Sequence, residues 1–432
     1  MDERKLATGR TATLQSAAMT TTPHYPRFIE AKLGATLADT PIALIHGPRQ
    51  CGKTTLTQTY GEAHGYGYFS FDDPVVAAAA EADPVGFVGD LPSRVTLDEV
   101  QRVPSVFTAL KAVVDRDRQP GRFILTGSAN VLFVPKLADS LAGRMTLLRL
   151  HPLTQCEIAG EDHEFIDRLF RRGFRARNHK RLGRLLLARI ASGGYPAALA
   201  RSSHSRRATW YRDYVEALIQ RDVRDLARIR SLDVLPRLLA LVAAQTAQLL
   251  NVSDLAGPFR ISRPTVGDYV TLLERIFVLD VLPPWHSNRL SRLVKTPKIH
   301  AGDSGVACSL LGLGPDDLSK DRGMLGHLLE TFVFQELRRQ ASWQEGNLQF
   351  FHFRDKDKDE VDVVIERGVR EVAGVEVKAG ATVRDKDFRG LRKLQRAAGD
   401  GFASGAVLYD GETTSPFGER LFAVPIRTLW ER

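Results

Sequence analysis

The sequence predicts an α/β fold with several domains. In the N-terminal third, five short apolar runs alternate with stretches of helical character; the runs cover residues 41–46, 68–71, 94–97, 122–125 and 145–150. Strands separated by helices are typical of a parallel sheet that is covered on both faces. A glycine-rich loop joins the first run to the next helix, and polar residues follow two of the later runs. The length of 432 residues suggests roughly two to four domains.

The composition favours a folded protein without a membrane partner. Hydrophobic residues make up 43% of the chain and charged residues 26%, which excludes a disordered protein. No apolar run approaches the roughly eighteen residues of a membrane span. Three widely spaced cysteines form neither a disulfide framework nor a zinc motif, which favours a cytoplasmic location. Residues 1–25 lack the apolar segment of a secretory signal, and we expect a flexible tail in which Met19 is an alternative start.

The loop after the first apolar run matches the phosphate-binding pattern G-x-x-x-x-G-K-[ST] between a strand and a helix, as that pattern requires. Its glycines let backbone N–H groups face phosphate oxygens, and the helix N-terminus adds a positive partial charge. We expect Lys53 to reach the β- and γ-phosphates and the Thr54 hydroxyl to hold Mg²⁺. The predicted site for ATP and Mg²⁺ consists of Gly47, Pro48, Arg49, Gln50, Cys51, Gly52, Lys53, Thr54 and Thr55.

Polar residues near later strands complete the predicted site. We expect Asp98 to bind Mg²⁺ through water and Glu99 to polarise the attacking water. Ser128 or Asn130 would orient that water or sense the γ-phosphate. Arg144, just before the fifth run, would neutralise transition-state charge within one chain or on a neighbouring subunit. The other interpretation of Arg144 is an ordinary surface arginine.

Four strings in this region resemble the AAA+ ATPases, in particular a prokaryotic subgroup. They are GPRQ-x-GKTTL at residues 47–56, LDE-x-Q at 97–101, LTGS at 125–128 and L-x-GR at 141–144. The resemblance implies a five-stranded P-loop core and ATP hydrolysis. No second sensor arginine stands out in the stretch that would form a lid, so the sequence does not predict the usual closed ring. A homo-oligomer or a protein partner remains open.

The middle of the chain combines a basic stretch with a helix-turn-helix pattern. From Arg168 to Arg212 there are thirteen Lys or Arg residues and no Asp or Glu. Such a stretch attracts phosphate, but a solvated helical face has the same composition. Residues 249–256 and 262–274 form two predicted short helices around a Gly-Pro turn, with Ser262 as a suitable N-cap. Residues 276–282 and 292–299 would supply the wing strands of a winged helix.

Basic side chains would line one side of this winged helix for contacts with DNA phosphates. They are Arg260, Arg263, Arg289, Arg292 and Lys295. The alternative is a winged helix that packs only on protein.

The last third carries acidic residues and a lysine in an order typical of metal-dependent nucleases. Glu330 lies on a predicted helix and Asp362 on a strand, while Glu376 and Lys378 share one face of a second strand by period two. A turn between the strands would bring Asp362 and Glu376 together. Such carboxylates can hold Mg²⁺ or Mn²⁺ that activates water, and the lysine helps to deprotonate the nucleophile. The other interpretation is a cross-strand ion-paired surface.

This arrangement resembles the PD-(D/E)XK nuclease superfamily. The chain from about Trp210 also resembles the DUF4143-type domain that commonly follows this ATPase type. The likeness is carried by residues 295–305, 326–330, 360–362 and 376–378. It implies a restriction-endonuclease-like α/β fold that binds DNA, with or without cutting it.

Together these features predict five parts. They are a flexible tail (1–25), an AAA+ ATPase core (26–160), a basic helical lid or linker (161–235), a winged helix (236–300) and a nuclease-like domain (301–432). The predicted function is an ATP-hydrolysing switch that controls a DNA-binding and, if the second site is active, DNA-cleaving domain. The alternative is a protein-interaction ATPase whose winged helix and nuclease-like fold serve as scaffolds.

Overall fold

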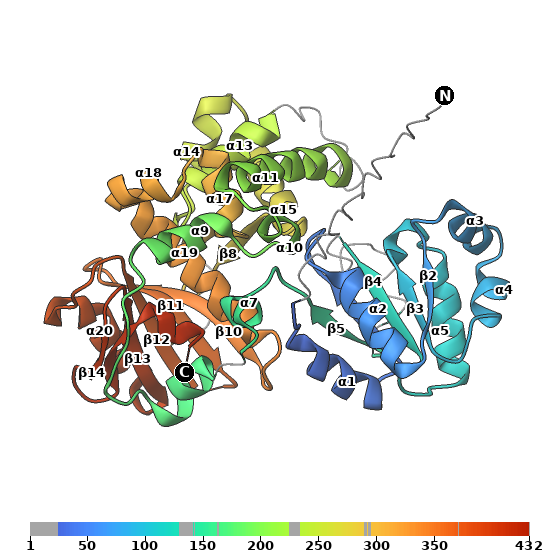
Figure 1. Cartoon of the computed structure of the whole chain (residues 1–432), viewed down its shortest axis with the longest axis horizontal. Coiled ribbons are helices and arrows are strands. Elements are labelled where there is room, and N and C mark those ends of the chain that lie inside the picture. Colours follow the sequence, from blue (N-terminus) through green and yellow to red (C-terminus); the bar gives the residue numbers. More distant parts are fainter. Residues whose placement is uncertain are drawn as a thin grey trace, which may run out of the picture.

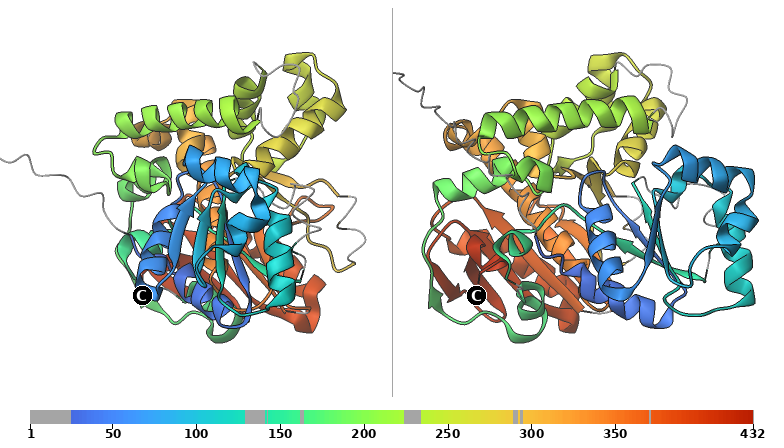
Figure 2. Two further views of the ribbon diagram at one scale, coloured as in Figure 1. Left: turned by 90° about the vertical axis from the view of Figure 1, so that its right-hand side faces the viewer. Right: turned by 45° about the vertical axis from the view of Figure 1, so that its right-hand side comes forward.

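The computed structural model describes residues 25–128, 141, 143–161, 164–223, 234–288, 292, 295–369 and 371–431. The predicted tail lies outside these residues except for Tyr25, and so does Asn130. In the described part of the chain, no helix combines the length and the apolar character needed to cross a bilayer. Figures 1 and 2 show an N-terminal sheet with its helices beside a larger body formed by the rest of the chain.

A five-stranded parallel sheet forms the N-terminal part, as predicted. In the spatial order β2-β3-β4-β1-β5, its strands are β2 (Gly67–Ser70), β3 (Val95–Asp98), β4 (Phe123–Gly127), β1 (Ile42–His46) and β5 (Met145–Arg149). Because the strands are parallel, the carboxyl ends of β1, β3 and β4 meet at one edge of the sheet.

Helices cover both faces of this sheet. Alternate residues of β1 face opposite cores, with Ile42 and Leu44 in one cluster and Ala43 and Ile45 in the other. The Ile42 side packs on α3 (Pro74–Ala82), α4 (Pro84–Gly89) and α5 (Val106–Arg116), and the Ala43 side packs on α1 (Ile29–Asp39) and α2 (Lys53–His64). A sheet buried on both faces explains why β1 reads as a continuous apolar run.

The structure divides the predicted lid of residues 161–235 between two places. After α7 (Gln155–Ala159), the segment with α8 (Phe165–Asp167), β6 (Arg177–Asn178) and α9 (Arg184–Ser192) packs on the C-terminal core. The segment with α10 (Pro196–Leu199) and α11 (His204–Leu218) instead faces the phosphate loop, and α11 runs along the top of the molecule (Figure 2). The predicted lid or linker thus has two parts in the structure, because the apolar side chains of α8 and α9 join the C-terminal core.

The described residues between 234 and 301 include three α-helices and three strands, and we call this region the three-strand unit. The elements are α13 (Val234–Ala244), β7 (Gln248–Leu249), α14 (Val252–Ala256), α15 (Arg263–Arg275), β8 (Leu279–Leu282) and β9 (Lys298–Ala301). The strands are antiparallel in the order β7-β9-β8. Ser262 caps α15 by accepting a hydrogen bond of 3.2 Å from the Thr265 N–H. The wing strands are shorter than expected, and β7 joins them.

A seven-stranded mixed sheet forms the C-terminal domain, in the order β10-β11-β12-β13-β15-β14-β6. Its strands are β10 (Leu348–Arg354), β11 (Glu360–Arg367), β12 (Glu371–Lys378), β13 (Phe402–Tyr409), β14 (Thr413–Pro416) and β15 (Leu421–Pro425), with β6 at the edge. Helix α19 (Arg322–Ala341) packs on one face and α20 (Arg389–Ala398) on the other. Helices α17 (Ser304–Leu311) and α18 (Pro315–Lys320) connect the three-strand unit to α19.

The loop between β8 and β9 docks on the C-terminal sheet. The Trp285 N–H donates to the His352 carbonyl at 2.6 Å, and the His352 N–H donates to the Pro283 carbonyl at 2.9 Å. Arg292 pairs with Glu366 at 2.7 Å and keeps only 11% of its side chain exposed. Arg292 was predicted to contact phosphate. In the structure it is held instead by a nearly buried carboxylate of the same chain.

The other predicted phosphate contacts have different positions. Arg260, Arg263 and Lys295 are exposed, and Arg289 lies outside the described residues.

Candidate functional site

The phosphate loop is curled by glycines that no other residue could easily replace. Gly52 has φ = 100°, a left-handed conformation, immediately before α2 begins at Lys53. A Cβ atom on Gly47 would lie 2.0 Å from the Leu150 carbonyl oxygen, which leaves no room for a side chain. Lys53 donates to the carbonyls of Gly47 at 3.1 Å and Pro48 at 2.9 Å. An ammonium has three donors, so one remains for a phosphate oxygen.

The other loop residues divide into pocket-lining and buried positions. Arg49, Gln50, Thr54 and Thr55 line a cavity of about 640 Å³ above the loop. The Cys51 side chain is fully buried and donates weakly to the Leu150 carbonyl at 3.5 Å. Cys51 can therefore meet a nucleotide only through its backbone.

Asp98 is the centre of a polar cluster at the end of β3. The Thr54 hydroxyl donates to Asp98 Oδ2 at 3.1 Å, and the Tyr68 phenol donates to the same oxygen at 2.8 Å. The Thr126 hydroxyl donates to Asp98 Oδ1. A hydroxyl beside an oriented carboxylate is a donor set that suits Mg²⁺. Tyr68 and Thr126 were not predicted, although Tyr68 begins the second apolar run and Thr126 directly follows the fourth.

Glu99 follows Asp98 in a backbone conformation that is uncommon for a non-glycine residue, with φ = 57°. The Gln101 amide donates to the Glu99 carboxylate and, at 3.0 Å, to Ser128 Oγ. Burial works to raise the pKa of Glu99, but Lys53, Gln101, Arg49 and Ser128 together hold it below its ordinary value. Glu99 is thus an ionised carboxylate at the mouth of the loop cavity.

Helix α11 closes the other side of the cavity. Trp210, Asp213, Tyr214 and Ala217 line it, together with Arg221 just beyond the helix end. The Tyr214 hydroxyl lies within hydrogen-bond distance, 3.2 Å, of the Arg49 carbonyl oxygen in the loop. The phosphate loop and α11 are therefore in direct polar contact.

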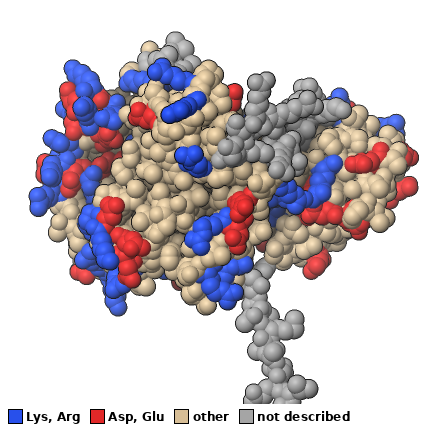
Figure 3. Space-filling model, turned by 90° about the horizontal axis from the view of Figure 1, so that it is seen from above, with Lys and Arg blue, Asp and Glu red and all other residues tan. Residues whose placement is uncertain are grey.

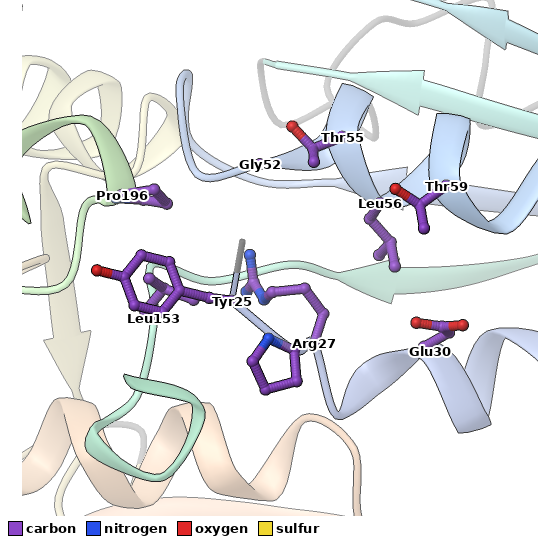
Figure 4. Close-up of a pocket in the computed structure, with 10 residues that line it drawn as sticks. Tyr25, Arg27, Glu30, Gly52, Thr55, Leu56, Thr59, Leu153 and Pro196 are labelled. Carbon is purple, nitrogen blue, oxygen red and sulfur yellow. The ribbon is translucent and has the colours of Figure 1, made fainter. Parts of the chain in front are cut away.

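A second cavity of about 330 Å³ adjoins the first through Gly52, Thr55 and Pro196, which line both. Figure 4 shows it enclosed by the Tyr25 ring, Leu153 and Pro196 on one side and by α2 on the other, with Arg27 below. Arg27 is held by the Cys51 and His151 carbonyls, at 2.6 Å each, and by Glu157 at 2.9 Å. This wall is therefore rigidly supported.

Arg144 lies at the other end of the sheet from the loop. It immediately precedes β5, whereas the last residue of β5, Arg149, stands opposite His46 beside the loop. Arg144 pairs with Asp115 of α5. It therefore lies away from the nucleotide site of its own chain, and the remaining predictions are a role on a neighbouring subunit or an ordinary surface arginine.

The C-terminal domain brings Glu330, Asp362 and Glu376 to one place. Strands β11 and β12 pair with Val363 opposite Val375, so Asp362 and Glu376 come next on neighbouring strands. The Val377 N–H donates to Asp362 Oδ2 at 2.9 Å, and Lys378 pairs with Glu376 at 2.6 Å. Burial, reinforced by Asp362, raises the pKa of Glu376 to about 8.

A further lysine lies among these carboxylates. Lys298 Nζ is 2.7 Å from Glu330 and 3.3 Å from Asp362. In the part of the chain that the structure describes, no group of three or more His, Cys, Asp or Glu side chains is arranged to hold a metal ion. The predicted Mg²⁺ or Mn²⁺ set of Glu330, Asp362 and Glu376 does not fit a metal here, because Lys298 pairs with two of these carboxylates and Lys378 with the third.

Comparison with known proteins gives matches along most of the chain. An AAA domain model matches residues 39–159, a domain of unknown function (DUF8612) residues 183–317, and another (DUF4143) residues 325–429. The chain is 30% identical over 397 residues to Rv2008c of Mycobacterium tuberculosis, covering 91% of this chain and 82% of that protein. This chain belongs to the Rv2008c family of AAA-domain ATPases. It is also 23% identical over 368 residues to MJ1544 of Methanocaldococcus jannaschii, covering 82% and 78% of the two chains.

Solved structures resemble this AAA-domain ATPase more distantly. The Walker-type ATPase PABY2304 of Pyrococcus abyssi is 14% identical with a TM-score of 0.38, over 65% of this chain and 94% of that one. The Thermotoga maritima RuvB Holliday junction branch migration motor is 15% identical with a TM-score of 0.26, over 59% and 89%. At these scores the likeness says nothing more about this chain.

The family matches correct one predicted boundary. The expected DUF4143-type likeness began near Trp210, but the DUF4143 match begins at residue 325, and residues 183–317 match the separate DUF8612 domain. In this AAA-domain ATPase, the region that contacts the phosphate loop therefore belongs to a different family domain from the carboxylate cluster.

Sequence reasoning also missed several site residues of this AAA-domain ATPase. Tyr214 and Arg221 reach the loop cavity from the lid, where the predicted charge pattern drew attention to arginines only. Lys298 lies within residues 295–305, which carry part of the DUF4143-type resemblance. The signal that could have identified it is a lysine at the start of a buried strand.

Proposed function

We propose that this protein binds and hydrolyses ATP between its phosphate loop and α10–α11, and that the bound nucleotide sets the position of this lid. The observation that carries the proposal is the cavity of about 640 Å³ lined by both the loop and α11. Tyr214 supports it, because a hydrogen bond to the Arg49 carbonyl makes the lid sensitive to the conformation of the loop.

The two adjoining cavities suit the two ends of ATP. The larger one contains Lys53, Thr54 and Glu99 and would take the phosphates. The smaller one is lined by Tyr25, Leu56 and Leu153, whose apolar surfaces suit a purine base. Arg221 would face the phosphates from the lid side, the position of the second sensor arginine that the sequence alone did not reveal.

Thr54 and Asp98 would hold Mg²⁺, since their oxygens lie 3.1 Å apart at the helix start. The bound Mg²⁺ would neutralise negative charge on the phosphate oxygens. Glu99, held by Gln101, would orient and polarise the attacking water. Ser128 would fix Gln101 and thereby the position of Glu99.

The nucleotide state would reach the rest of the chain through α11 and β5. Helix α11 packs on α17, where Ser309 donates to the Ala208 carbonyl at 2.7 Å. Arg149 at the end of β5 pairs with Asp280 of the three-strand unit. A lid movement would therefore change contacts on α17, and a shift of β5 would change contacts on the three-strand unit.

Phosphate release from ATP tests the hydrolysis proposal. We expect Lys53→Ala and Glu99→Gln to reduce turnover by at least a hundredfold, on the scale of single groups that act on the transition state. Lys111→Ala on α5, away from the loop, is the matched control and should turn over normally. Unchanged turnover in both site variants would exclude the proposed ATPase mechanism.

A second candidate function, binding of DNA phosphates, is favoured by one basic surface cavity, which we call the groove. Arg168, Arg175, Arg177 and His179 line a cavity of about 700 Å³ beside β14. Among the described residues, no acidic side chain pairs with Arg168, Arg175 or Arg177. Burial lowers the pKa of His179, and Arg177, Arg427 and Arg168 lower it further, while Glu431 works against them. The balance indicates a net positive field at His179.

The three-strand unit has the element order of a winged helix and would be the other DNA contact, through Arg260 and Arg263. Figure 3 looks from above onto the face over α11 and α13, where Lys and Arg stand among Asp and Glu on a largely uncharged surface. We therefore place the stronger phosphate contact at the groove.

Fluorescence anisotropy with a labelled duplex distinguishes these contacts. We expect Arg175→Glu with Arg177→Glu to weaken binding more than Arg260→Glu with Arg263→Glu, and the salt dependence to fall with each lost contact. A larger effect of Arg260 and Arg263 would move the contact to the winged helix. Absence of any binding at low salt would favour the protein-interaction scaffold.

A further inference from the structure

We propose that Lys298 is the resident cation of the C-terminal carboxylate cluster and keeps this cluster free of divalent metal. We expected a metal from the order along the chain of Glu330, Asp362, Glu376 and Lys378. The residues as placed do not fit one, and this disagreement is the basis of the inference, which is independent of the ATPase proposal.

Lys298 fills the centre of the cluster. Its Nζ lies 2.7 Å from Glu330, 3.3 Å from Asp362 and 3.5 Å from Glu360. The lysine is 3% exposed, so its charge is compensated by these carboxylates and not by solvent. Lys298 donates hydrogen bonds to Glu330 and Asp362, and Glu360 adds a third negative charge beside the ammonium.

A second lysine forms an ion pair with the remaining carboxylate of the predicted metal set. Lys378 pairs with Glu376 at 2.6 Å, and the Asp362 oxygen that faces away from Lys298 accepts from the Val377 N–H at 2.9 Å. Each carboxylate of the predicted metal set therefore has a positive or N–H partner on at least one oxygen, and Glu376 Oε2 is the buried oxygen without one. A divalent ion would have to displace Lys298, whose charge would then be buried without a partner.

Lys298 comes from a different part of the chain, which explains how it is held in place. It begins β9 of the three-strand unit, whereas its partners belong to α19 and β11. The loop before β9 is attached to the same sheet through Trp285 and His352, and through the Arg292–Glu366 ion pair of 2.7 Å. The His352 ring also lies 3.2 Å from the Thr296 carbonyl, two residues before Lys298.

This docking also encloses the cluster. Glu330, Asp362 and Glu376 are each exposed by less than a tenth. A phosphodiester backbone would reach them only after the three-strand unit moved away from β10. The cluster thus acts as an ion-paired lock between the three-strand unit and the C-terminal sheet.

Manganese binding to the nucleotide-free, full-length protein, measured by electron paramagnetic resonance, tests this proposal. We expect Asp362→Asn to leave the Mn²⁺ stoichiometry of the unmodified protein unchanged. We expect Lys298→Met, which keeps the length of the side chain, to gain about one equivalent of Mn²⁺ that Lys298→Met with Asp362→Asn lacks. Lys295→Met, three residues away on the exposed loop, is the control and should gain none.

Two results would overturn the proposal. One is an equivalent of Mn²⁺ in the unmodified protein that Asp362→Asn removes. The other is a folded Lys298→Met protein, checked by circular dichroism, that gains no Mn²⁺. If Lys298→Met does not fold, the comparison of the unmodified protein with Asp362→Asn and Glu330→Gln decides, because metal lost in both variants contradicts a lysine-filled site.

Discussion

Arg149, the last residue of β5, pairs with Asp280 of β8 at 3.3 Å across the boundary between the AAA domain and the three-strand unit. Arg338 of α19 pairs with the same oxygen of Asp280, and the Gln335 amide donates to its other oxygen at 2.9 Å. A single carboxylate therefore joins the ATPase sheet, the three-strand unit and the C-terminal domain. Burial works to raise the pKa of Asp280, but Arg338 and Arg149 hold it below its ordinary value.

We expect Asp280→Asn to lower the free energy of unfolding by about 3 kcal/mol, because it leaves two arginines without their shared carboxylate. We use the lower end of the usual range, since both arginine side chains remain 25% exposed. Urea denaturation measures the change. Asp268→Asn on the exposed side of α15 is the control, and equal stability of the two variants would contradict a shared role for Asp280.

Tyr214→Phe should weaken the binding of a non-hydrolysable ATP analogue about fivefold, because one hydrogen bond contributes about 1 kcal/mol. The bond is the contact of 3.2 Å between the Tyr214 hydroxyl and the Arg49 carbonyl. Tyr211→Phe removes a hydroxyl from the same helix, but that hydroxyl binds Ser192 and not the loop. Isothermal titration calorimetry gives both dissociation constants. Identical affinities of the two variants would show that the lid contact does not sense nucleotide.

Tyr68→Phe should raise the Mg²⁺ concentration needed for half-maximal ATP hydrolysis several-fold. The Tyr68 phenol donates to Asp98 at 2.8 Å and fixes the carboxylate that would hold Mg²⁺. Tyr66→Phe is a matched control, because its phenol donates to the Gly121 carbonyl in the same domain at 2.6 Å. A Mg²⁺ titration in which both variants behave like the unmodified protein would argue against orientation by Tyr68.

Glu336 on α19 predicts a pH-dependent stability. Burial raises the pKa of Glu336 to about 7, although Arg339 works against this. The folded protein then keeps a proton that the unfolded chain releases near its ordinary pKa of 4.5. This group's contribution to stability therefore falls as the pH rises from 4.5 to about 7 and changes little above that. Glu336→Gln removes the titration and can still accept the hydrogen bond from the Gln155 N–H.

We therefore expect Glu336→Gln to gain on the order of 2–3 kcal/mol relative to the unmodified protein between pH 5 and pH 8. Urea denaturation at both pH values gives the difference. Glu345→Gln, at an exposed position, should show no such trend. A stability difference that is the same at both pH values would mean that Glu336 is ionised in the folded protein throughout.

Local patterns predicted much of the ATPase part. Five apolar runs became five parallel strands, and the Gly47-to-Thr54 string became a loop with Lys53 at its centre, because backbone conformation and short-range contacts decide both. The same reasoning failed for residues 161–235. Their helices were expected, but which helices would pack on the C-terminal sheet depends on partners more than a hundred residues away, such as the contact of Arg181 with Asp410 at 3.0 Å.

The C-terminal carboxylate cluster shows most clearly the difference between what local sequence determines and what the tertiary structure decides. Sequence spacing alone determined that Asp362 and Glu376 would stand on neighbouring strands and that Lys378 would share a face with Glu376, since strand periodicity is local. Only the tertiary structure decided that Lys298, from another domain, would stand among them. Charge compensation in a buried site comes from whichever group the fold brings near, and sequence distance carries no information about that group.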